Sequence, residues 1–153
     1  MKKEFESIID SLPVLLEKLV NSRPLKRDNL QGMPECGIYV YYKDRIPLFV
    51  GRSDNMKKRI MAQSRKGSTH HSAPFAFLLA RNKAIAKGMD IENKTRNELI
   101  NDPLFNDLFI QSKEEVSKMS IRYVEVKNPE EQTIFQVYAS MELNTEFNKF
   151  ETH

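Results

Sequence analysis

Cationic side chains gather in one short part of the sequence. Between Arg52 and His71 stand six lysines or arginines and a single acid, Asp54. A concentration of positive charge of this kind is the usual footprint of phosphate binding, although a solvated helix face can have the same composition. The stretch therefore favours a nucleic-acid partner. Its candidate phosphate-binding residues are Arg52, Lys57, Lys58, Arg59, Arg65 and Lys66, with His70 and His71 behind them.

Two short apolar runs precede this stretch, and each contains a glycine-bearing triplet. The first run opens on Gly37-Ile38-Tyr39, and the second ends on Phe49-Val50-Gly51. Both runs are rich in β-branched and aromatic residues, and the polar break at 43–45 separates them, which predicts a hairpin of two strands. Gly51 is the kind of residue that lets a neighbouring group approach the backbone closely.

The two triplets, followed by Arg59 eight residues after Gly51, resemble the motif of the GIY-YIG nuclease family. In that family the triplets lie on paired strands, and a helix that follows them carries an arginine. The resemblance covers roughly residues 37–153, and only these short motifs within it are specific. It implies a metal-dependent DNA endonuclease that hydrolyses phosphodiester bonds with water and one Mg²⁺ or Mn²⁺ ion.

The resemblance assigns a role to four positions near the motif. Tyr39 matches the tyrosine that helps to deprotonate the attacking water, and Arg59 matches the arginine whose fork holds two phosphate oxygens. Phe49 replaces the second tyrosine, and it can neither relay a proton nor bind a phosphate through a hydrogen bond. Gln63 lies one helical turn after Arg59, where some members carry histidine or tyrosine, and an amide is no general acid or base.

The metal position implied by the resemblance is occupied by a glutamine. The family's C-terminal helix carries one glutamate that holds the ion, and Gln136 aligns with it. A neutral amide is a poorer ligand for a hard cation than a carboxylate. We therefore expect the chain as written to be impaired as an enzyme, whether by natural loss or by replacement. A site built from His70, His71 and His153 is conceivable, but adjacent histidines rarely share one ion.

The surrounding elements follow from periodicity and from residues that begin or end helices. The expected order is a helix, a hairpin, several helices, a strand and a final helix. This order predicts an α+β fold, with a small, mainly antiparallel, three-stranded sheet flanked by helices. We expect one domain over 1–153, in which an N-terminal helix and loop (1–36) precede the nuclease-like core (37–153). The expected strands are 37–42, 46–51 and 119–126; the expected helices are 3–21, 55–66, 75–87, 94–100 and 129–143. The segment 104–112 stays open between helix and loop, and 144–153 is expected to be an irregular tail.

Composition narrows the class of protein without fixing its function. The chain has 40% hydrophobic and 29% charged residues, which is ordinary for a soluble globular protein. No apolar run approaches the ~20 residues that span a bilayer. Cys36 is the only cysteine, so an internal disulfide and a cysteine-built zinc site are excluded, and a cytoplasmic location is the default.

Two further functions compete with the nuclease. The first is a catalytically inactive nucleic-acid-binding module that keeps the nuclease fold, which the residues at Phe49, Gln63 and Gln136 favour. The second is a protein-interaction domain whose basic helix contacts an acidic partner. For the nuclease we expect DNA as the partner, and a homodimer would let so small a chain cut both strands.

Overall fold

The computed structural model describes residues 1–150, so His153 and the end of the expected tail lie outside the described residues. The chain divides into two compact units. One unit, which we call the sheet unit, contains Met1–Lys58 and the chain from Met119 onward. The other, the helical unit, contains Arg59–Lys118.

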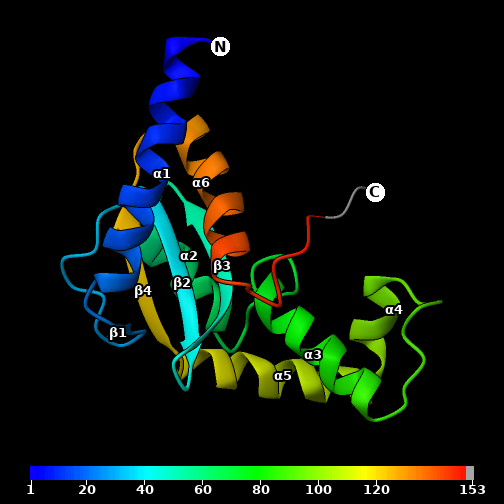
Figure 1. Ribbon diagram of the computed structural model, residues 1–153. Helices are drawn as coiled ribbons and strands as arrows, with labels where there is room; N and C mark the ends of the chain where they lie inside the picture. The colour runs from blue at the N-terminus through cyan, green and yellow to red at the C-terminus, as the bar shows by residue number, and fades with distance from the viewer. Residues whose placement is uncertain (151–153) are drawn as a thin grey trace. The chain divides into compact units, whose positions relative to one another are not determined.

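The sheet unit is built on one antiparallel sheet in the order β1-β4-β2-β3 (Figure 1). The α+β class with an antiparallel sheet is confirmed, but the sheet has four strands where we expected three. The added strand is β1, whose two residues are too short to give a periodic pattern, and it lies in the segment expected to be loop. The strands are β1 (Leu25–Lys26), β2 (Gly37–Lys43), β3 (Ile46–Ser53) and β4 (Ser120–Glu125).

The hairpin between β2 and β3 turns through two residues. Lys43 pairs with Ile46, which leaves Asp44 and Arg45 as the turn, one residue shorter than the break we expected. Both turn residues have positive φ, 51° at Asp44 and 69° at Arg45. This is the geometry of a type I′ turn, which matches the twist of paired strands and normally selects asparagine or glycine.

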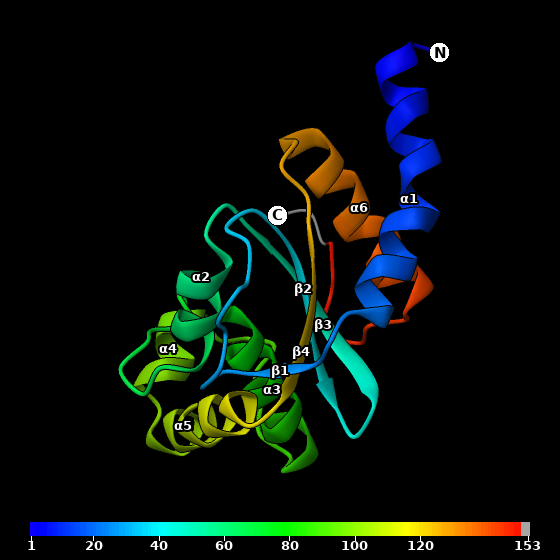
Figure 2. The same cartoon turned by 90° about the vertical axis from the view of Figure 1, so that its left-hand side faces the viewer.

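Two helices cover one face of the sheet: α1 (Lys3–Asn21) and α6 (Pro129–Glu142). Figure 2 shows both on the same side of the strands. Pro13 lies inside α1 without ending it, and the Ser11 hydroxyl donates to Glu131 of α6 at 2.7 Å. The core between the helices and the sheet includes Leu12, Leu15, Leu19, Ile38, Val40, Val50, Val124 and Phe135.

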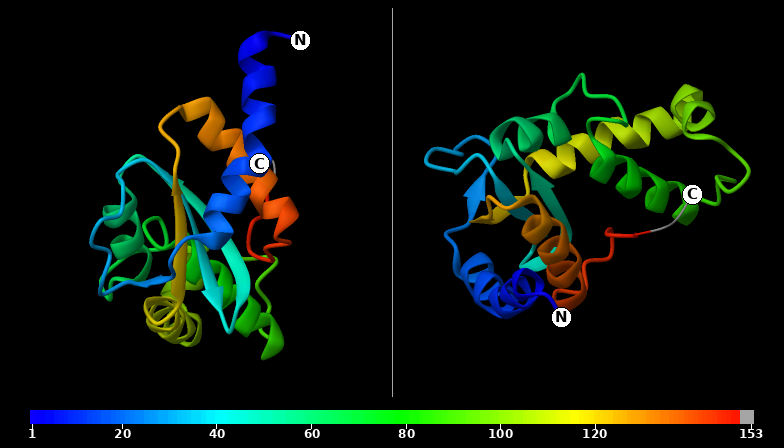
Figure 3. Two further views of the ribbon diagram at one scale, coloured as in Figure 1. Left: turned by 60° about the vertical axis from the view of Figure 1, so that its left-hand side comes forward. Right: turned by 90° about the horizontal axis from the view of Figure 1, so that it is seen from above.

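The helical unit consists of α3 (Pro74–Ala86), α4 (Arg96–Asn101) and α5 (Pro103–Ser117). Helix α3 packs along α5, and α4 packs against α5 (Figure 3). The segment left open at 104–112 is helical because Asp102 accepts hydrogen bonds from Leu104 N and Phe105 N, and Pro103 occupies the first turn. The rings of Phe77, Phe105 and Phe109 pack together between α3 and α5.

Helix α2 (Met56–Ser64) begins in the sheet unit and continues into the helical unit. Asn55 caps this helix, because its Oδ1 accepts from Lys58 N at 3.3 Å. Ser53 accepts from Asn55 N at 2.9 Å. Across residues 1–150, no helix has both the length and the apolar character that crossing a membrane would need.

Candidate active site and nucleic-acid interface

The two triplets of the sequence motif lie opposite one another on β2 and β3. Tyr39 is the direct partner of Gly51 in the antiparallel ladder, and Gly37 pairs with Ser53. Residues directly opposite in such a ladder project to the same face of the sheet. A Cβ built on Gly51 would overlap the ring and the hydroxyl oxygen of Tyr39. Because Gly51 has no side chain, the ring of Tyr39 occupies the space beside it.

Tyr39 is buried on the face of the sheet opposite to the one that α1 and α6 cover. Only 1% of its surface is exposed, and its ring meets that of Tyr41 edge-on at a centroid distance of 5.8 Å. Its ladder partner on the other side is Tyr123 of β4. Phe49 pairs with Tyr41 and so projects to this face as well. The structure thus groups Tyr39 with Phe49 among aromatic side chains.

Gln136 lies at the outer edge of β3, where the sheet ends. Its Nε2 donates to the carbonyl oxygen of Val50 at 3.1 Å. Asn148 completes this edge, because its Oδ1 accepts from Val50 N at 2.6 Å and its Nδ2 donates to Val50 O at 2.8 Å. The side chains of Gln136 and Asn148 therefore supply the hydrogen bonds that a further strand would make, and they protect the edge of the sheet.

This geometry uses the part of glutamine that glutamate lacks, namely the N–H donor. Gln136 extends from α6, on one face of the sheet, to the carbonyl oxygen of Val50, whereas Tyr39 projects from the other face beside Gly51, the next residue of β3. Within residues 1–150, no cluster of three or more histidine, cysteine, aspartate or glutamate side chains has an arrangement that could hold a metal ion. In this structure the amide of Gln136 protects the edge of β3.

The predicted phosphate-binding cations of the sheet unit are all exposed. Arg52 follows Gly51 on β3, and Lys57 and Lys58 lie in the first turn of α2. Met56 and Ile60, on the other side of α2, are completely buried and fix which way the helix faces. The amphipathic pattern thus leaves the two lysines in solvent, where ammonium groups can meet phosphates.

The predicted residues of the helical unit divide into exposed and buried ones. Arg65 and Lys66 are exposed, and Arg59 is half-buried. Gln63 is only 1% exposed, and its Oε1 accepts from Phe75 N at 3.4 Å, at the start of α3. The amide of Gln63 therefore links α2 to the start of α3, which is a structural role independent of any part in catalysis.

A lysine that sequence reasoning did not single out fixes the loop after α2. Lys113 of α5 is 5% exposed, and its Nζ donates to the carbonyl oxygens of Lys66 at 2.7 Å and Ser68 at 2.8 Å. The ammonium also lies 4.5 Å from the centroid of the Phe109 ring. Burial lowers the pKa of Lys113. Its helical spacing with the buried Phe105, Phe109 and Val116 of α5 was the only signal available in the sequence.

The two adjacent histidines have different surroundings. We expected both to face DNA or solvent, and this is wrong for His70, which is 7% exposed and packs against the ring of Phe77 at 5.7 Å. His71 is exposed, with its ring centroid 4.0 Å from that of His70. Burial lowers the pKa of His70, and the positive charges of His71 and Arg96 lower it further.

The lowered pKa of His70 predicts a loss of stability in mild acid. His70 takes up a proton at about pH 6.5 in the unfolded chain and only at lower pH in the folded chain. Its contribution to the free energy of unfolding is therefore complete above pH 6.5 and is lost as the pH falls below that value. We expect the urea midpoint of the His70→Gln variant to fall less than that of the unmodified chain between pH 7.5 and 5.5. His71→Gln is the matched control, and it should keep most of the slope because burial is the main cause. Equal slopes in all three proteins would contradict this account of His70.

Comparison of the chain with protein-family models, with curated proteins and with solved structures gives no match. The class of this protein therefore rests on its own residues and geometry.

Proposed function

We propose that this chain is a DNA-directed domain of the GIY-YIG nuclease type, which hydrolyses phosphodiester bonds with one Mg²⁺ or Mn²⁺ ion and is impaired by the glutamine at position 136. The observation that carries the proposal is the pairing of Tyr39 with Gly51. It gives a physical reason for the spacing of the two triplets, because the tyrosine needs a residue without a side chain directly opposite.

Each predicted residue has a stated part in this function. Tyr39 acts as the base that takes a proton from the attacking water, and Arg59 holds two oxygens of the scissile phosphate. The exposed cations Arg52, Lys57, Lys58, Arg65 and Lys66 bind the DNA backbone, which positions the strand without reading its sequence. The metal would supply charge neutralisation at the phosphate, and a carboxylate at position 136 would be the residue to hold it.

A second function, a nucleic-acid-binding module without catalysis, is favoured by three observations. Gln136 donates a hydrogen bond to the edge of β3, Gln63 is buried between two helices, and Tyr39 is 1% exposed. A catalytic base needs contact with water, and Mg²⁺ prefers a carboxylate to a neutral amide oxygen. The binding module retains the exposed cations and requires neither.

Both functions predict binding to DNA that weakens steeply as salt is added. Each phosphate contact releases condensed counterions, so the slope of log K against log salt is about −0.9 per contact with duplex DNA. Replacing Lys57, Lys58 and Arg65 by glutamine should lower the slope by about 2–3 and weaken binding to unrelated sequences equally. Fluorescence anisotropy with a labelled duplex between 50 and 200 mM salt measures both quantities.

The matched control replaces three other exposed lysines of the chain, Lys3, Lys18 and Lys127, by glutamine. This variant has the same net charge as the first, so a general effect of charge would weaken both equally. We expect the control to bind as the unmodified chain does. Binding that does not depend on salt, or equal losses in the two variants, would contradict a nucleic-acid interface at these residues and favour the protein-interaction domain.

A further inference from the structure

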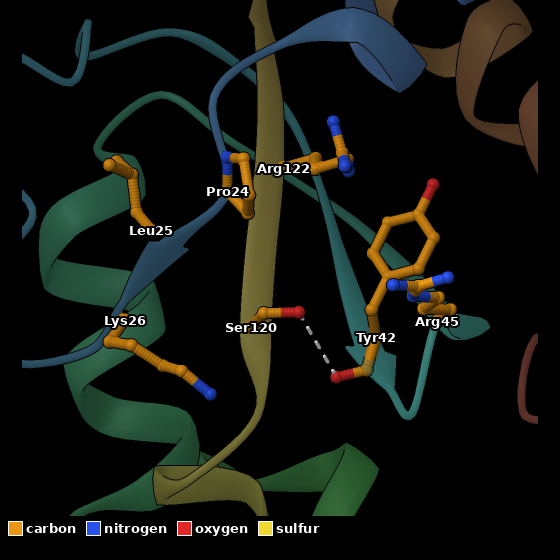
Figure 4. Close-up of a pocket in the computed structure, with 7 residues that line it drawn as sticks. All are labelled: Pro24, Leu25, Lys26, Tyr42, Arg45, Ser120 and Arg122. Carbon is orange, nitrogen blue, oxygen red and sulfur yellow. Dashed lines mark hydrogen bonds between the residues drawn. The ribbon is translucent and has the colours of Figure 1, made fainter.

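A cavity of about 620 Å³ lies on the sheet unit, away from the residues discussed so far. Figure 4 shows its lining, which comes from β1 and the residue before it, from β4, and from the end of the β2–β3 hairpin. Tyr42 pairs with Ser120 across β2 and β4, and Tyr42 packs against the core under α1 and α6, so the cavity opens on the face opposite to Tyr39. The lining residues are Pro24, Leu25, Lys26, Tyr42, Arg45, Ser120 and Arg122.

The polar lining is cationic. Lys26, Arg45 and Arg122 bring three positive charges, and none of the seven residues is acidic. Ser120 adds a hydroxyl. Tyr42 adds a phenol, which like any tyrosine is protonated at neutral pH; burial raises its pKa further, against the opposing effect of Arg122. The Ser120 hydroxyl donates to the carbonyl oxygen of Tyr42 at 3.5 Å. The three cations and the Tyr42 phenol can donate hydrogen bonds to a ligand, which is the chemistry that an anion with several oxygens requires.

Arg122 is fixed in place before any ligand arrives. Its Nη1 donates to the carbonyl oxygens of Val20, at 2.8 Å, and Ser22, at the end of α1. Its guanidinium also lies 5.7 Å from the centroid of the Tyr42 ring. A guanidinium carries five N–H donors, so the second terminal nitrogen and Nε take no part in these two bonds. A fixed planar fork suits a phosphate group, because less side-chain freedom is lost on binding.

Arg45 occupies a backbone conformation that its residue type disfavours. Its φ is 69°, in the left-handed region, where a type I′ turn normally places glycine. A residue with a Cβ atom is strained in this region, and backbone strain of this kind clusters at functional sites. Here the side chain of Arg45 lines the cavity. Glycine at position 45 would relieve this strain, but it would remove one of the three cations of the cavity.

From the size, charge and strain together, we propose that this cavity binds a phosphomonoester of nucleotide size. Its volume lies within the range of small-molecule sites, about 300–1,000 Å³. A terminal phosphate carries nearly two negative charges and three free oxygens, which match the cations and hydroxyls of the lining. Pro24 supplies an apolar wall for the uncharged part of the ligand. The ligand is either a free mononucleotide or the 5′-phosphate end of a strand, and it binds whether or not the chain cleaves DNA.

The test is calorimetric titration of the whole chain with adenosine 5′-monophosphate, adenosine and inorganic phosphate. We expect the monophosphate to bind at least about tenfold more tightly than either of the others, since each lacks half of the recognised chemistry. A DNA hexamer with a 5′-phosphate, compared with the same hexamer bearing a 5′-hydroxyl, separates the two sources. Tighter binding of the phosphorylated hexamer would show that the ligand is the 5′-phosphate end of a strand. Equal binding of the two hexamers would show that it is a free nucleotide. Failure of both the monophosphate and the phosphorylated hexamer to bind would overturn the proposal.

Arg45→Gly is the most informative variant, because we expect it to stabilise the fold and to weaken ligand binding. Removal of the strained side chain should raise Tm, while the affinity for the monophosphate should fall about tenfold or more. Arg45→Asn, which tolerates positive φ, should repeat the loss of affinity without adding the flexibility of glycine. Lys127→Ala removes the same charge from an exposed position outside the cavity and should bind normally. Unchanged affinity in both Arg45 variants would overturn the assignment of the cavity, and neither result bears on DNA cleavage.

Discussion

Gly51→Ala is expected to destabilise the protein by about 3 kcal/mol, the upper end of the usual range for an overpacked core. The added methyl group would overlap the ring of Tyr39, which lies between β3 and Tyr123 of β4 with 1% of its surface exposed. The obstruction comes from a rigid ring on the neighbouring strand, and the ring has no open space to enter. Urea unfolding followed by circular dichroism measures the change as a shift of the midpoint at constant slope.

Gly67→Ala is the matched control for this substitution. Gly67 has no positive φ, and a Cβ added there meets nothing within 4 Å, so the change in stability should stay within about 0.5 kcal/mol. A second test combines Gly51→Ala with Tyr39→Ala. If the ring causes the cost, the alanine at position 51 should be nearly neutral once the ring is absent, which appears as a coupling energy in the double-mutant cycle. Additive effects of the two substitutions would show that Tyr39 and Gly51 are not coupled.

The sequence predicted those elements whose pattern is local and long. Residues of α1 repeat at helical spacing, and the runs that become β2 and β3 are bounded by polar breaks. The hairpin was recognised although its turn carries arginine where glycine is usual, because the flanking runs have strong β character. Strand β1 was missed since its two residues are held only by pairing with β4. No local pattern records a partner that lies almost one hundred residues away.

The candidate site was predicted less completely because burial and orientation are tertiary properties. Gly51 was recognised as a position of close approach, but only the ladder identifies Tyr39 as the group that approaches it. The sequence placed His70 beside the basic stretch, and packing against Phe77 removed it from solvent. Likewise, the amide of Gln136 became a donor to the edge of β3, which its position in a helix did not indicate.

The edge of β3 decides what can be expected of a glutamate at position 136. A carboxylate has no N–H to give to Val50 O, although Asn148 still donates to the same oxygen at 2.8 Å. In the presence of a chelator we therefore expect Gln136→Glu to lower the free energy of unfolding by about 1–2 kcal/mol. Gln136→Met is the matched control, since it loses the same hydrogen bond without adding a charge.

Addition of Mg²⁺ or Mn²⁺ should separate these two variants. A hard cation prefers carboxylate oxygen, so the metal should restore the stability of Gln136→Glu and leave Gln136→Met unchanged. If Tyr39 and Arg59 act as proposed, the glutamate variant should nick plasmid DNA about 10²-fold faster than the unmodified chain, which is the usual effect of one group that stabilises the transition state. A glutamate variant that neither gains stability nor cuts DNA with either metal would rule out position 136 as a metal ligand and leave the binding module. Efficient nicking by the unmodified chain would show instead that the metal is held elsewhere, and that Gln136 serves only to close the edge of the sheet.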